Sequence, residues 1–246
     1  MNALRTLTAT ELRLFARTPT SVFMALLLPS LLLVLQGFVI PGMNEPMAGG
    51  SLRTIDLLIP IAFTVALLSV AVINYPTAIA GYRQLGVLRR LDVTPVGAPR
   101  VLFAQWIVSI LSYAAAVAVT GAFAFLAFGA SVPRNLVLVI AIIALGAVTM
   151  MAVGSIIAAR APSPQAANGI GMLVFIASLY TAGVWTPGDT MPETMRTVSG
   201  FTPLGAMSQS LTSAWYEGTA TLAPILVMGA WALICSLLAI RLFRWR

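Results

Sequence analysis

Long stretches without a charged residue are the feature that most constrains this chain. Six stretches of at least 23 residues lie between successive charged residues, and a helix needs about 20 mostly apolar residues to cross a hydrocarbon core roughly 30 Å thick. Only 9% of the 246 residues are charged, against about 25% in an ordinary soluble domain. The sequence therefore predicts an integral membrane protein and excludes a soluble globular enzyme.

We expect an all-α fold of six transmembrane helices in a single domain over residues 1–246. The expected spans cover about 20–40, 57–80, 101–127, 135–159, 167–186 and 221–241. With a cytoplasmic N-terminus, this topology leaves only Arg53, Arg134 and Arg196 of the 14 basic residues outside. Because positive charge concentrates on the cytoplasmic side of membrane proteins, both termini are expected in the cytoplasm.

Missing residue types exclude several functions. The chain has no His, a single Cys, and no Lys, since all 14 basic residues are Arg. Histidine-based catalysis, a cysteine-rich zinc site and a lysine-containing phosphate-binding loop are therefore excluded. No acidic residue lies well inside a span, which disfavours proton- or sodium-coupled transport. We expect no enzyme activity, no bound metal and no ATP hydrolysis by this chain itself.

Residues 1–19 have the pattern of a helix lying in the membrane interface. Leucines and Phe15 fall on one side at helical spacing and arginines on the other. The alternative is an ordinary charged flank of the first span. Glu11 interrupts the apolar side, and we expect it to pair with an arginine of the next cytoplasmic loop.

The loop 81–100, GYRQLGVLRRLDVTPVGAPR, predicts a short amphipathic helix at the cytoplasmic face. Leu85, Leu88 and Leu91 recur every third residue, and Thr94-Pro95 ends the helix. Such a helix suits docking on another protein. An ordinary positive-inside loop would explain the arginines but not the leucine spacing.

The outer segment 186–220 predicts two short helices with apolar faces. Thr202-Pro203 can open the second, whose apolar residues are Leu204, Met207, Leu211 and Trp215. We expect these helices to re-enter the outer leaflet or to cap the bundle between spans five and six, and a loosely ordered surface loop is the alternative.

Together these parts resemble the membrane subunits of type-2 ATP-binding-cassette exporters, which include daunorubicin-resistance-like drug exporters. The resemblance rests on FARTP before the first span, RQLGVLRRLDVTP, the outer segment and the closing FRW. It implies an N-terminal connecting helix, a coupling helix and re-entrant outer helices. The coupling positions that it implies are Arg83, Gly86, Leu88, Arg89, Arg90, Leu91, Thr94 and Pro95, with Glu11 assigned to the same group. Many members carry an acid near Arg83, where this chain has neutral Gln84.

The resemblance implies a permease in the bacterial cytoplasmic membrane that exports a hydrophobic or amphipathic molecule. A separate nucleotide-binding subunit would hold ATP and magnesium, and a second copy or a related permease would complete the path. Membrane lipid is a further expected partner and nucleic acid is not. The candidate path-lining residues are Phe63, Asn74, Tyr75, Phe175, Tyr180 and Trp185. Polysaccharide or peptide export, and a non-transporting anchor or immunity protein, are the alternatives.

Overall fold

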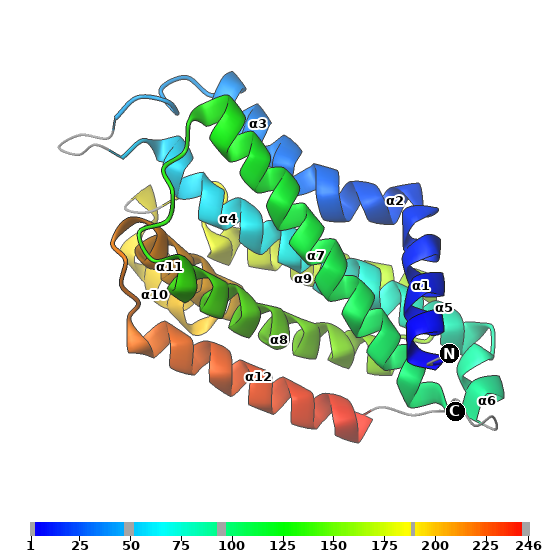
Figure 1. Ribbon diagram of the computed structural model, residues 1–246. Coiled ribbons are helices and arrows are strands. Elements are labelled where there is room, and N and C mark those ends of the chain that lie inside the picture. Colours follow the sequence, from blue (N-terminus) through cyan, green and yellow to red (C-terminus); the bar gives the residue numbers. More distant parts are fainter. Residues whose placement is uncertain (1–2, 47–51, 93–96, 188–189, 243–246) are drawn as a thin grey trace.

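The computed structural model describes residues 3–46, 52–92, 97–187 and 190–242. Within these ranges the regular secondary structure is helical, apart from one isolated bridge between Pro46 and Arg53. Figure 1 shows long helices lying side by side, with short helices at the two ends of the bundle. The expected all-α architecture is confirmed.

The helices follow one another through short connections. Their bounds are α1 (Ala3–Ala16), α2 (Pro19–Val22), η1 (Phe23–Leu27), α3 (Leu28–Val39), α4 (Thr54–Leu68), η2 (Ser69–Asn74), α5 (Tyr75–Gln84), α6 (Val87–Asp92), α7 (Ala98–Phe128), α8 (Leu136–Arg160), α9 (Pro164–Ala182), α10 (Glu193–Phe201), α11 (Pro203–Tyr216) and α12 (Leu222–Leu242). The π-helical turns η1 and η2 each precede a proline, Pro29 and Pro76. Proline lacks an N–H, and its ring crowds the carbonyl four residues earlier, so the helix widens at that turn.

Five helical segments in the described part of the chain are long and apolar enough to cross a membrane. They are Pro19–Val39, Thr54–Gln84, Arg100–Phe128, Leu136–Arg160 and Leu222–Leu242, and they match five of the six expected spans. The remaining expected span, 167–186, coincides with α9, which is not among the five. α9 has 19 residues and begins Pro-Gln-Ala-Ala-Asn-Gly, and these polar first turns lower its mean hydropathy.

The segment Thr54–Gln84 forms the centre of the bundle. Its apolar stretch is entirely buried, and α3, α7, α8, α9 and α11 all contact it. Two glycines let neighbouring helices approach its backbone closely. A Cβ at Gly154 of α8 would lie 1.9 Å from the Ala71 carbonyl oxygen, and one at Gly171 of α9 would lie 2.2 Å from that of Val72. Small residues thus create close helix contacts, as they commonly do in membrane bundles.

The short helices lie at opposite ends of the bundle. α1, α6 and the C-terminal end of α12 lie toward one end, which we call the α6 end (Figure 1). α10, α11 and the connection between α3 and α4 lie toward the other, the α11 end. α1 lies across the bundle, packs on α7 and turns sharply into α2. The N-terminal helix expected over 1–19 is therefore present as α1, with α2 beginning at Pro19.

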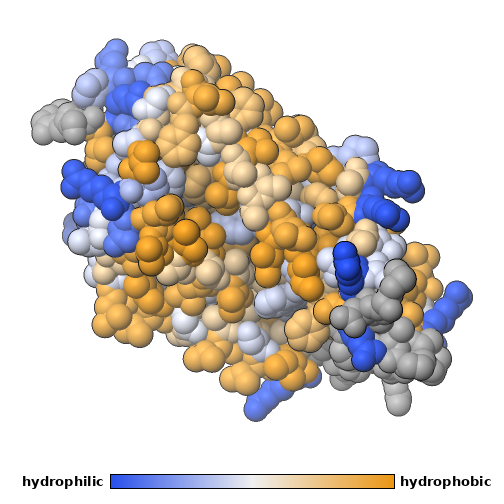
Figure 2. All heavy atoms as spheres, viewed as in Figure 1, coloured by the Kyte–Doolittle hydropathy of each residue, from blue (hydrophilic) through white to orange (hydrophobic). Residues whose placement is uncertain are grey.

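The surface divides in the same way. Figure 2 shows apolar residues over the middle of the visible face and hydrophilic residues gathered toward its two ends. Large exposed apolar side chains on the long helices include Leu126, Val137, Leu173 and Ile240, all more than 70% exposed. A wide apolar belt between polar ends is the surface that a lipid bilayer covers.

Both expected short helices of the outer segment are present as α10 and α11. The Thr202 Oγ accepts a hydrogen bond from the Gly205 N–H at 3.2 Å and caps α11 as expected. Leu204, Met207 and Leu211 are fully buried, because α11 packs against α4, α8, α9 and α12. The apolar face predicted from the sequence therefore seals one end of the bundle.

Candidate functional site

One leucine fixes the short helix α6 to the bundle. Gly86 has a φ of +69°, a left-handed conformation that glycine adopts without strain, and it turns the chain from α5 into α6. Leu88 is 2% exposed and packs against Val101 of α7. The partly buried side chains around this pair are Leu7, Tyr82 and Leu91. Leu88 therefore faces the inside of the chain, where α6 meets α1 and α7.

Three neighbouring side chains face away from the bundle. Leu85 is 70% exposed, and Arg89 and Arg90 are exposed as well. We call these three residues the coupling face. Sequence reasoning singled out both arginines but not Leu85, although its place in the every-third-residue pattern was visible. Of the other coupling candidates, Thr94 and Pro95 lie outside the described residues.

Arg83 lies between the coupling face and the bundle. Its Nη1 donates a hydrogen bond to the Ala161 carbonyl oxygen at 3.0 Å, in the connection between α8 and α9. This hydrogen bond ties the start of the coupling loop, at the end of α5, to the end of α8.

Glu11 is buried where α1 crosses α5 and α7. Its Oε2 accepts hydrogen bonds from the Tyr82 hydroxyl and from Gln105 Nε2, the latter at 3.0 Å. The expectation that Glu11 pairs with an arginine is therefore wrong. Among the described residues, two neutral donors, Tyr82 and Gln105, hold this carboxylate. Burial raises the pKa of Glu11 above its ordinary value of 4.5, and the Tyr82 hydrogen bond opposes part of that rise.

Two of the six path candidates line a cavity of about 250 Å³, which we call the α1 pocket. Asn74 and Tyr75 form part of its wall, and Asn74 Nδ2 donates to the Ser21 carbonyl oxygen at 3.0 Å. The Tyr75 hydroxyl receives a hydrogen bond from Trp106 Nε1 at 3.3 Å. The lining residues are Glu11, Leu14, Phe15, Thr18, Ser21, Val70, Asn74, Tyr75, Thr77, Ala78, Tyr82, Gln105, Val108, Ser109 and Ser112. The lining residues from α7 were not predicted from the sequence, because their place in the pocket depends on how α1 crosses α7. They are Gln105, Val108, Ser109 and Ser112.

The other four path candidates lie elsewhere. Phe63 is 3% exposed and its ring centroid is 5.5 Å from that of Trp215, while Phe175 is 6% exposed. Tyr180 and Trp185 are both more than half exposed, with ring centroids 5.7 Å apart. The six residues therefore occupy the bundle interior, its surface and the α1 pocket rather than one continuous lining.

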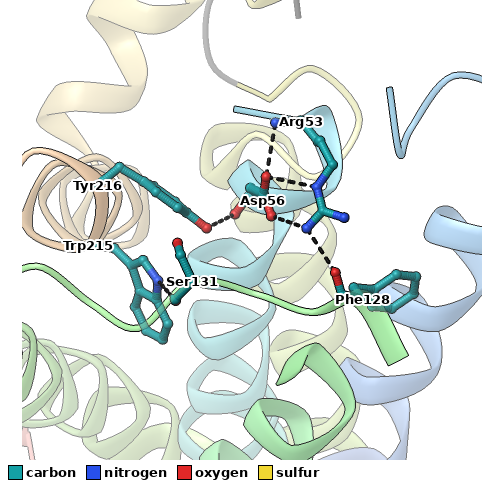
Figure 3. A network of polar contacts seen from close by, with 6 residues as sticks. All are labelled: Arg53, Asp56, Phe128, Ser131, Trp215 and Tyr216. Atoms are coloured by element: carbon teal, nitrogen blue, oxygen red, sulfur yellow. Dashed lines mark hydrogen bonds and ion pairs between the residues drawn. The ribbon is translucent and has the colours of Figure 1, made fainter. Parts of the chain in front are cut away.

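A polar network at the α11 end joins α4, α7 and α11 (Figure 3). Arg53 donates from Nε to Asp56 Oδ2 at 3.1 Å and from Nη2 to Asp56 Oδ1 at 2.8 Å. The same Nη2 donates to the Phe128 carbonyl oxygen at 2.9 Å, and the Tyr216 hydroxyl donates to the Asp56 carbonyl oxygen at 2.7 Å. Trp215 Nε1 completes the set by donating to the Ser131 carbonyl oxygen at 3.0 Å. We call these six residues the outer network.

The outer network borders a cavity of about 460 Å³. Sequence reasoning missed this site, because its partners are up to 160 residues apart. The one signal in the sequence was the closely spaced pair Arg53 and Asp56 at the start of the second span. Two charged side chains held together at a span boundary can lock the ends of three helices.

The described residues of these sites are joined by hydrogen bonds and by packing of side chains. No group of three or more metal-ligating acids, cysteines or histidines occurs in the ranges that the structure describes. The contacts instead connect the coupling face and α1 at one end to the outer network at the other, through the continuous segment Thr54–Gln84.

Comparison with known proteins identifies the family. The family model described as ABC-2 type transporter matches residues 2–216, which include the coupling face, the α1 pocket and the outer network. A search of curated proteins finds no match. Permeases of this family generally work with an ATPase subunit. The chain therefore belongs to the ABC-2 type transporter family and is its multi-pass membrane permease, a transport subunit without catalytic activity of its own.

Proposed function

We propose that this permease exports a hydrophobic or amphipathic molecule from the cytoplasm, driven by ATP and Mg²⁺ bound to a separate ATPase subunit. A second copy of the chain, or a related permease, would complete the transport path. A drug-like molecule of the kind moved by daunorubicin-resistance-like exporters, or a lipid, is the substrate class we favour. The observation that carries the proposal is the coupling face.

The coupling face suits a partner protein because it is rigidly mounted and solvent-facing. Leu88 anchors α6 against Val101, so force on Arg89 and Arg90 would be passed to α1 and α7 rather than absorbed by a loose loop. Two exposed arginines beside an exposed Leu85 offer charge around an apolar contact. Charge of this kind favours a surface with acidic residues.

We further propose that α9 is the sixth crossing, which puts both termini and α6 on the cytoplasmic side of a bacterial membrane. α9 begins just after the Arg83–Ala161 contact at the α6 end. At its other end, the Thr181 and Ala182 carbonyl oxygens accept hydrogen bonds from Ser199 and Ser208 of the outer segment. It therefore reaches from one end of the bundle to the other while packing along η2 and α5, which compensates for its polar first turns.

In this proposal, the segment Thr54–Gln84 carries the movement between the two ends. At about 1.5 Å per residue it is roughly 45 Å long, and its ends hold the Tyr82–Glu11 and Arg53–Asp56 contacts. ATP-driven closure of the ATPases would push on α1 and α6, tilt this segment and break the outer network to open the path outward. α10 and α11 would act as the re-entrant cap.

The test is co-purification of the permease with the ATPase encoded beside it in the genome. We expect Arg89→Glu combined with Arg90→Glu to abolish stable association, because two attractive charges become repulsive. Arg134→Glu, which changes an exposed arginine far from α6, is the matched control and should co-purify normally. Equal association of all three proteins would show that the coupling face does not bind the ATPase.

A further inference from the structure

The α1 pocket combines one carboxylate with oxygen atoms that have no partner, and we propose that it binds the ammonium group of an amphipathic cation. This inference rests on the proposed function, because it names the chemical class of molecule that the permease takes up at the α6 end. Three features of the pocket support this assignment: its charge, its unpaired oxygen atoms and its apolar wall.

The charge comes from Glu11. It is 6% exposed, and the other lining residues are uncharged. Both of its hydrogen bonds end on Oε2, so Oε1 accepts none from the described residues. Neutral donors leave the negative charge of a buried carboxylate uncompensated, which is costly in apolar surroundings. A cation entering the pocket would supply the missing charge at Oε1.

The unpaired oxygen atoms come from two hydroxyl groups. The Ser112 Oγ and the Thr77 Oγ are buried without a hydrogen-bond partner, and both residues line the pocket. The Ser112 side chain is 4% exposed. Buried polar groups are nearly always hydrogen-bonded in folded proteins, so these two indicate a ligand or water with N–H or O–H groups. Neither hydroxyl takes part in holding α1 in place.

The apolar wall sets the shape of the molecule. Leu14, Phe15, Val70 and Val108 line the pocket beside the rings of Tyr75 and Tyr82. Aromatic faces attract organic cations, and the aliphatic side chains suit the carbon chain attached to one. The volume of about 250 Å³ is just below the range of roughly 300–1,000 Å³ for drug-sized ligands. It therefore fits a cationic head and the first part of an apolar body.

The charge also excludes other head groups. An anion, or a phosphate next to an ammonium group, would be brought close to the Glu11 carboxylate and repelled. A simple amphipathic cation is consequently favoured over a zwitterionic lipid, although both carry an ammonium group.

The experiment measures binding of benzylammonium, whose N–H groups can reach the two hydroxyls, to the full chain in a neutral detergent at neutral pH by equilibrium dialysis. We expect saturable binding at one site per chain, a dissociation constant at least tenfold higher in Glu11→Gln, and substantial recovery in Glu11→Asp, which restores the charge. Glu45→Gln removes an exposed carboxylate at the opposite end and should bind like wild type. Ser109→Leu should block binding by filling the pocket while leaving Glu11 intact.

Three results would overturn the inference: no binding to wild type, binding to Glu11→Gln within twofold of wild type, or equal competition by benzenesulfonate. Displacement by phosphatidylethanolamine would contradict the preference for a simple amphipathic cation over a zwitterionic lipid. Absence of displacement would support a free cation. ATPase co-purification is measured on the same samples. If the wild-type chain binds the cation but does not associate with the ATPase, only the proposed function is contradicted. The reverse result contradicts only the cation site.

Discussion

Breaking the Arg53–Asp56 pair should reveal how strongly the outer network holds the ends of α4, α7 and α11 together. The pair has two side-chain hydrogen bonds in a forked arrangement, at 2.8 and 3.1 Å, and its side chains are 25% and 8% exposed. Exposed ion pairs contribute about 0.2–1 kcal/mol, whereas removing one partner of a buried pair costs about 3–5 kcal/mol. For this half-buried pair we expect Asp56→Asn to lower the free energy of unfolding by about 2 kcal/mol.

The arginine has a second role that the same experiment separates. Arg53→Met also removes the hydrogen bond to the Phe128 carbonyl oxygen, so its cost should exceed that of Asp56→Asn by about 1 kcal/mol. The double variant should cost less than the sum of the two single variants, because each single variant already removes the same ion pair. We expect this difference, the coupling energy, to be about 1–2 kcal/mol.

The assay is unfolding in mixed micelles with increasing sodium dodecyl sulfate, followed by tryptophan fluorescence. Trp215 lies within the outer network and should report its loss. Tyr216→Phe, which removes only the 2.7 Å hydrogen bond to the Asp56 carbonyl oxygen, should cost about 1 kcal/mol. A coupling energy below about 0.5 kcal/mol would contradict this prediction, because the two charges would then not hold the ends of α4, α7 and α11 together.

Substitutions at three further sites test their packing and their response to pH. Gly154→Ala should destabilise the protein by about 1–3 kcal/mol, because the added Cβ meets the Ala71 carbonyl oxygen; Gly169→Ala, with open space around it, should be neutral or slightly stabilising in the same unfolding assay. Leu88→Ala should speed tryptic cleavage after Arg89 and Arg90 several-fold by loosening α6, and similar cleavage of wild type and variant would contradict its role as an anchor. Because the pKa of Glu11 is raised in the folded state, this group takes up a proton on folding only at pH values between its unfolded and folded pKa. Its contribution to stability should therefore be complete below pH 4.5 and be lost as pH rises through the folded-state pKa. Glu11→Gln should remove that component of the pH dependence, and an unchanged profile of melting temperature against pH would count against it.

Only part of the coupling face could be predicted from the sequence. The spacing of Leu85, Leu88 and Leu91 predicted a short amphipathic helix, and the resemblance to type-2 exporters implied that Arg89 and Arg90 are coupling positions. Spacing could not decide which leucine turns inward, because α6 has only 6 residues and its orientation depends on α1 and α7. The structure buries Leu88 and exposes Leu85, which makes the first an anchor and the second part of the surface.

The sequence by itself determined that this chain is a helical membrane protein. Crossing a bilayer depends on composition within about 20 consecutive residues, so six spans were predicted from the distances between charged residues. Five of them coincide with helices that are long and apolar enough to cross a membrane, and the sixth coincides with α9, whose first turns are polar. Tertiary structure alone decided the partners of Glu11, the α1 pocket and the outer network. The hydrogen bonds of Glu11 to Tyr82 and Gln105, and that of Tyr216 to Asp56, join residues 71, 94 and 160 positions apart. Such separations in sequence are closed by the packing of whole helices around the segment Thr54–Gln84 rather than by any local pattern.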